Sequence, residues 1–137
     1  MGFNEFLTKL FGNKSQRDLK EITPYVEKVK AVYPSIKELS NDELRGRIDA
    51  IKQRIQDYVA DERAKVNSLR EDIDGKELGE REAIWAEVDK IEKEITDKME
   101  VVLEEVLPEV FAIVKDTARR FAENPEVVVT ANDFDRD

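Results

Sequence analysis

The stretch from Ser40 to Ile73, SNDELRGRIDAIKQRIQDYVADERAKVNSLREDI, decides the fold of this chain. Ser40 and Glu43 have the spacing of a capping box, and Leu39 with Leu44 can form the accompanying hydrophobic staple. Apolar residues then recur at helical spacing, and the eleven residues from Ile55 to Val66 indicate a straighter or locally right-handed seam. They are Leu44, Ile48, Ile51, Ile55, Val59, Val66, Leu69 and Ile73. The pattern predicts one amphipathic helix over residues 40–73, about 51 Å long.

A second apolar stripe of the same kind lies within residues 80–106. It follows a turn that we predict from Asp74-Gly75 and Gly79. Two amphipathic helices joined by a short turn fold back on each other, so the sequence predicts a coiled-coil-like antiparallel helical hairpin. The residues predicted to form its seam are Ile48, Ile51, Ile55, Val59, Val88, Ile91, Ile95, Met99 and Val102.

Shorter helices are predicted on both sides of the hairpin. A stripe of Leu19, Ile22, Val26, Val29 and Val32 indicates one before it, with a kink or restart at Thr23-Pro24 and an end at Tyr33-Pro34. After the hairpin, Pro108 suits the first turn of a new helix, which Asn124-Pro125 ends. Its apolar stripe is Val110, Phe111, Val114, Ala118 and Phe121. The fold class expected is therefore all-α, with residues 125–137 as a short extended or disordered tail that contains the β-prone run 127–130.

The first residues of the chain form a candidate interaction site. Their apolar side chains fall on one face of a short helix that Gly12 ends, so we predict an amphipathic helix within residues 1–14. Such a helix is too short to be stable alone and needs a partner surface. The residues predicted to contact a membrane or channel are Phe3, Phe6, Leu7, Lys9, Leu10 and Phe11. The alternatives are that this face packs back on the protein or pairs with a second copy in self-association.

Composition excludes several classes of function. The chain has 137 residues, 40% of them charged, and a net charge of −9, which argues against nucleic acid as a partner. It contains no Cys and no His, so thiolate chemistry, Cys/His zinc sites and histidine acid–base catalysis are excluded. No phosphate-binding loop occurs and no apolar run reaches the length of a membrane span, so we expect a cytoplasmic, non-enzymatic chain with no cofactor of its own.

Two blocks of the sequence resemble a known family. Residues 5–48, EFLTKLFGNKSQRDLKEITPYVEKVKAVYPSIKELSNDELRGRI, are similar to the start of the bacterial SecA preprotein translocase motor. The likeness lies in Leu10-Phe11-Gly12, in Pro34 and in the capping motif at Ser40. Residues 107–120, LPEVFAIVKDTARR, resemble that family's Leu-Pro-Glu-Ala-Phe-Ala helix, with Lys115-Asp116-Thr117 in place of Arg-Glu-Ala.

The resemblance implies a division of the chain. Residues 1–14 would be the amphipathic helix, residues 15–48 and 107–124 the helical start of the motor's first nucleotide-binding domain, and residues 49–106 an inserted hairpin. The family's adenine motif and phosphate loop are absent, so the chain is expected to be an N-terminal segment of a longer protein. ATP and Mg²⁺ would then bind only to the rest of that protein.

The resemblance also implies partners and a location. The parent would push preproteins through the SecYEG channel and would sit on acidic phospholipid at the cytoplasmic face of the inner membrane. This segment would contribute docking and helical scaffolding. The alternative from the residues alone is a stand-alone helical-hairpin adaptor or scaffold that acts by protein–protein contact, and an enzyme using carboxylates ranks below both.

Overall fold

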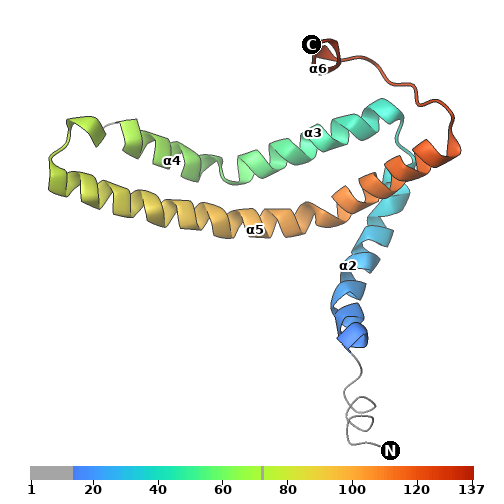
Figure 1. The fold of residues 1–137 in the computed structure, drawn as a ribbon, viewed down its shortest axis with the longest axis horizontal. Coiled ribbons are helices and arrows are strands. Elements are labelled where there is room, and N and C mark those ends of the chain that lie inside the picture. Colours follow the sequence, from blue (N-terminus) through green and yellow to red (C-terminus); the bar gives the residue numbers. More distant parts are fainter. Residues whose placement is uncertain (1–13, 72) are drawn as a thin grey trace, which may run out of the picture. The chain divides into compact units, whose positions relative to one another are not determined.

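The computed structural model describes residues 14–71 and 73–137, the side chain of Asp74 excepted. Its helices are α2 (Lys14–Lys37), α3 (Asn41–Tyr58), α4 (Ala60–Glu71), the 3₁₀ turn η1 (Ile73–Gly75), α5 (Leu78–Glu123) and α6 (Asp133–Arg136) (Figure 1). These ranges hold helices, turns and loops and no strand, which confirms the predicted all-α class. The helix predicted within residues 1–14 lies outside the described residues.

The chain forms two compact units. The described part of the first comprises residues 14–39 and 108–127, and the second comprises Ser40–Leu107 and Val128–Asp137. The second unit therefore contains both arms of the hairpin, together with the last ten residues of the chain. The sequence analysis predicted that residues 49–106 are a segment inserted relative to the family. The two compact units do not test that prediction.

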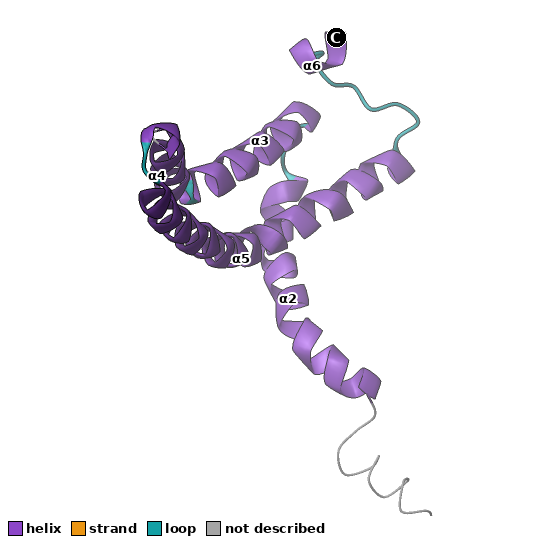
Figure 2. Ribbon diagram, turned by 60° about the vertical axis from the view of Figure 1, so that its left-hand side comes forward, coloured by secondary structure: helices purple, strands orange, loops and turns teal. Residues whose placement is uncertain are grey.

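The second unit is an antiparallel helical hairpin, as predicted. Ion pairs join α3 and α4 to α5 along its length. They are Arg54–Glu105, Glu62–Lys98 and Arg70–Glu92. Residue numbers rise along one arm while they fall along the other, so the two arms run in opposite directions. Figures 1 and 2 show α3 and α4 beside the first part of α5, with the reversal at η1.

The first arm is not one helix, and the prediction of a continuous helix over residues 40–73 is wrong. It breaks at Val59, which has φ −121° and ψ 12° and caps α3 through a backbone bond from its N–H to the Gln56 carbonyl oxygen (3.3 Å). Val59 itself is fully buried. One turn after Val59, the position that would continue the apolar stripe holds Glu62. No apolar side chain at that position therefore favours one continuous helix over the two helices α3 and α4.

Proline interrupts neither α2 nor α5. The predicted end of a helix at Tyr33-Pro34 and the predicted restart at Pro108 are both wrong, because α2 continues to Lys37 and α5 runs unbroken from Leu78 to Glu123. A proline inside a helix removes one backbone hydrogen bond. Pro108 is itself buried, and burial of the residues around it offsets that loss. The buried neighbours are Val102, Val106, Ala112 and Ile113.

The tail after α5 has no regular structure between residues 124 and 132. The β-prone run 127–130 forms no strand within the described chain. The tail then ends in α6, a single helical turn that the sequence analysis did not predict. Asn132 caps it, with its side chain accepting from the Asp135 N–H at 3.2 Å.

Candidate functional site

The residues predicted to contact a membrane or channel cannot be placed. Phe3, Phe6, Leu7, Lys9, Leu10 and Phe11 all lie outside the described residues. Their role stays a prediction. Elsewhere, within residues 14–71 and 73–137, no helix is both long enough and apolar enough to cross a membrane.

The predicted seam residues lie at or near the contact between the hairpin arms. Ile51, Val59, Val88, Ile91 and Val102 are buried, and the remaining four are half-buried. Toward the turn, Val66 of α4 packs with residues of α5 in one apolar cluster. Its other members are Val88, Ile91, Leu69, Ile84 and Ile95. The functional part of the prediction, a scaffold built on this seam, stays a prediction.

Charged residues cross the seam beside the break at Val59. Lys98 donates to Glu62 at 2.8 Å, and its ammonium lies 5.9 Å from the centre of the Tyr58 ring. The hydrogen bond from Lys98 lowers the pKa of Glu62, and the same bond raises the pKa of Lys98. Both groups therefore stay charged near neutral pH. Glu62 stands in the turn of α4 where the apolar stripe of the first arm is interrupted, and its ion pair with Lys98 joins the two arms there. The role of the pair is therefore structural.

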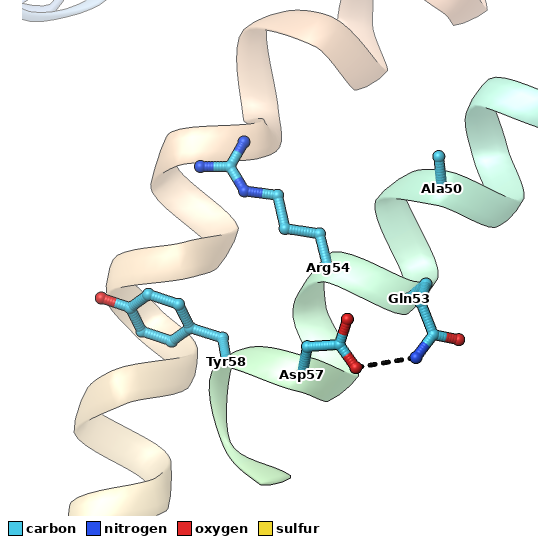
Figure 3. A pocket seen from close by; sticks show the side chains of 5 residues that line it. All are labelled: Ala50, Gln53, Arg54, Asp57 and Tyr58. Atoms are coloured by element: carbon cyan, nitrogen blue, oxygen red, sulfur yellow. Dashed lines mark hydrogen bonds between the residues drawn. The ribbon is translucent and has the colours of Figure 1, made fainter.

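A shallow surface depression runs along α3 (Figure 3). Every residue that lines it comes from this one helix: Ala50, Gln53, Arg54, Asp57 and Tyr58. Gln53 donates to Asp57 at 2.8 Å, and Arg54 pairs with Glu105 of α5. Because its walls come from a single helix, the depression does not enclose a ligand, and its charged groups are already paired. Over the described residues, no cluster of carboxylates could hold a metal ion.

The most tightly organised polar site is in the first unit, around Asp116 of α5. This carboxylate has no exposed surface. One oxygen accepts from Arg119 Nε at 2.9 Å and from the Tyr33 hydroxyl of α2 at 3.2 Å. The other oxygen accepts from Arg120 Nε at 2.7 Å. Arg120 also donates to the Leu39 carbonyl oxygen, so this cluster ties the two segments of the unit together.

The Asp116 cluster is a structural centre held in its ionised form. Burial raises the pKa of Asp116, but hydrogen bonds from Arg120 and Arg119 outweigh burial and leave the pKa below its ordinary value. Hydrogen bonds to Asp116 and Glu123 raise the pKa of Arg119. Asp116 and Arg119 are therefore both charged over the whole physiological range. The bonds of the cluster join α2 and the loop before α3 to α5, so the arrangement suits cross-linking of helices.

Sequence reasoning missed this cluster because it followed the wrong face of the helix. Of the predicted stripe after Pro108, Phe111, Val114 and Phe121 are strongly exposed, Phe121 at 68%. The buried face instead carries Ala112, Ile113, Asp116 and Arg120. The available signal was the spacing of Asp116 to Arg119 and Arg120, three and four residues, which favours ion pairs on a helix.

The exposed apolar stripes make the first unit a candidate docking surface. On α2, one stripe runs from Leu19 through Ile22 and Val26 to Tyr33 and Ile36. Its second half is covered, since Ile36 is buried and Tyr33 bonds to Asp116. Its first half is exposed, with Leu19 61% exposed, and Figures 1 and 2 show this end of α2 leading away from the part of α5 in the same unit, residues 108–123. Single exposed apolar residues are common, but a continuous stripe indicates an interaction site.

Comparison with known proteins identifies relatives over the whole chain. Residues 7–130 match the model of the SecA DEAD-like domain. The chain is 83% identical over all its 137 residues to a protein translocase subunit SecA of Parabacteroides distasonis and 64% identical over the same length to one of Porphyromonas gingivalis. A SecA of Amoebophilus asiaticus is 40% identical over 97% of the chain.

The match covers only part of each relative. The chain spans 12% of the length of each of these SecA proteins. No solved structure matches the chain. The segment 49–106, which the resemblance alone treats as an insertion, is present in the Parabacteroides relative, because that match extends over the full chain.

Proposed function

This chain belongs to the SecA family, and on that premise we propose that it is the N-terminal helical part of an ATP-driven preprotein translocase. In this role it acts as a scaffold rather than as the site of chemistry. Its first residues contact acidic phospholipid and the SecYEG channel, and the apolar stripes of its first unit pack against the rest of the translocase. ATP and Mg²⁺ bind outside this chain.

The exposed half of α2 is the observation that carries the scaffold role. A helix of this kind gains most of its stability from packing of its apolar face, yet Leu19, Ile22 and Val26 are all exposed within the described chain. The chain spans only 12% of the length of its relatives, which supports the rest of a translocase as the partner of this face. The family match over residues 7–130 likewise favours the translocase over a stand-alone adaptor.

We expect Ile22→Asp to be nearly silent in the 137-residue chain and harmful in the full-length translocase. In the isolated chain Ile22 is exposed, so the substitution changes the free energy of unfolding by about 0.5 kcal/mol or less. In the full-length protein it places an unpaired charge in an apolar contact, which costs on the order of 2 kcal/mol or more. Thermal unfolding of both proteins measures the difference.

Ala31→Asp is the matched control for this comparison. It adds the same charge to the same helix at an exposed position away from the stripe. If both substitutions affect the full-length protein equally, the stripe is not a contact with the rest of the translocase.

The proposed membrane contact predicts weak, salt-sensitive binding to anionic vesicles. The short helix predicted within residues 1–14 combines an apolar face with Lys9, and nearby cations add about 1 kcal/mol each at an anionic surface. Co-sedimentation of the chain with anionic vesicles should therefore exceed that with neutral vesicles at low salt and should fall at high salt. A chain lacking residues 1–12 should lose this difference, and equal binding of both chains would remove the membrane role from this segment.

A further inference from the structure

The last ten residues of the chain return to the start of α3 and are held there by a set of polar contacts, here called the tail clasp. Asp42 accepts from the Thr130 N–H at 2.9 Å and from the Thr130 hydroxyl at 2.9 Å. Arg45 donates to the Thr130 carbonyl oxygen at 2.8 Å and to Asp135 at 2.6 Å. Asn41 donates to the Val128 carbonyl oxygen at 2.9 Å.

The tail clasp recognises the backbone as well as side chains. Every polar group of Thr130, namely its N–H, its carbonyl and its hydroxyl, is bonded to α3. The Asp135 oxygen that accepts from Arg45 also accepts from the Asn132 N–H, so the clasp and the cap of α6 share one carboxylate. The guanidinium of Arg45 bridges a carbonyl and a carboxylate with separate N–H groups of its rigid, planar fork.

The clasp closes a large loop. Arg45 and Thr130 are 85 residues apart in the sequence, and the hairpin together with the second segment of the first unit lies between them. The clasp therefore connects residues 128–135 directly to α3, the first helix of the hairpin. Along the chain, the same residues are connected to the hairpin only through α5.

The contacts of the clasp are exposed and polar, which makes it separable from the fold. Apolar residues of the tail contribute little burial, since Val128 and Val129 are exposed and Phe134 is 91% exposed. The bonds made by Asp42 and Arg45 involve a charged group, but they lie at an exposed surface, where water can replace each bond when it breaks. The clasp can thus open at small cost while the buried seam of the hairpin stays intact.

We propose that the tail clasp is a releasable connection that couples the hairpin to the chain leaving α5. This inference rests on the proposed function, in which the ATP-binding part of the translocase lies outside this N-terminal segment and is joined to it through the residues after α5. With the clasp closed, movement of the hairpin is transmitted to residues 128–136. With the clasp open, the hairpin and the ATP-binding part move independently.

Two measurements test the coupling, with Asp42→Ala/Arg45→Ala as the open-clasp variant. In the 137-residue chain, hydrogen exchange of the Thr130 amide should become at least tenfold faster, while the helicity and the amides of the seam are unchanged. In the full-length translocase, basal ATP hydrolysis should be retained, and its stimulation by a preprotein should fall at least twofold. Lys52→Ala, which removes an exposed cation from α3 outside the clasp, is the control and should change neither.

The outcomes separate the inference from its premise. Slow exchange of Thr130 in the variant would show that no clasp exists, and fast exchange with full stimulation would show that the clasp couples nothing. Absence of ATP hydrolysis in the unaltered full-length protein would instead overturn the proposed function and the coupling with it, whereas the exchange result would still report the clasp.

Discussion

Asp116→Ala is expected to lower the free energy of unfolding of the first unit by about 3–5 kcal/mol. The substitution removes a carboxylate that pairs with both Arg119 and Arg120. Arg120 is 9% exposed, so its charge would remain largely buried after the ion pair with Asp116 is lost. Removal of one member of a buried pair costs more than the pair contributes, because the other charge is left without compensation.

Chemical denaturation, followed by circular dichroism, measures this loss. Asp97→Ala is the matched control, because Asp97 is an exposed carboxylate on the same helix and its removal should change the free energy by about 0.5 kcal/mol or less. Asp116→Asn keeps the shape of the side chain and one acceptor oxygen, so its loss should fall between the two. Equal stability of the Asp116→Ala and Asp97→Ala variants would mean that the cluster does not hold the unit together.

The same cluster gives a pH dependence with a definite sign. The pKa of Asp116 is lower in the folded chain than the value of about 3.9 expected in the unfolded chain. Its contribution to stability is therefore fully present above about pH 4 and is lost as the pH falls through the folded pKa. The Asp116→Ala variant lacks this contribution at every pH, so the difference in stability between it and the unaltered chain should shrink on acidification.

The sequence predicted correctly those features that depend on residues close together in the chain, namely the helix cap before α3 and the antiparallel hairpin. The capping box at the start of α3 is present as predicted, with Ser40 N–H donating to Glu43 at 2.8 Å and Glu43 N–H donating to the Ser40 hydroxyl at 3.2 Å. The antiparallel hairpin also followed from spacing, because each arm carries one dominant apolar stripe and a Gly-containing turn joins them.

Predictions failed where a distant contact overrides a local preference. Pro34 and Pro108 each remove a backbone hydrogen bond from a helix. Near Pro34 the burial of Ile36 outweighs this loss, and at the second site the burial of Pro108 itself does so. On α5 two faces are apolar between residues 108 and 123, and the buried one is the face that bonds to Tyr33 and Leu39 through Asp116 and Arg120. The Asp116 cluster and the tail clasp join residues more than 80 apart, which no local pattern reveals.

Ile51→Asp is expected to destabilise the hairpin by several kcal/mol. Ile51 is a buried member of the seam on α3, and a carboxylate placed there would lose its hydration in an apolar contact. The lost burial of the isoleucine side chain adds to this cost, at about 25 cal/mol for each Å² of apolar surface. Thermal unfolding monitored by circular dichroism should show a lower midpoint and reduced helicity.

Ala50→Asp separates this effect from charge and helix propensity. Ala50 is the adjacent residue on α3 and is exposed, so the substitution adds the same charge but leaves the seam intact. Its cost should not exceed the difference in helix propensity, about 0.7 kcal/mol. Loss of stability confined to Ile51→Asp therefore identifies apolar packing between α3 and α5 as the source of stability.

If the two variants unfold alike, the arms do not depend on this contact, and the cross-arm ion pairs Arg54–Glu105 and Glu62–Lys98 would have to hold the hairpin instead. The Arg54–Glu105 pair is exposed, and an exposed pair contributes at most about 1 kcal/mol, which is too little for two helices of this length.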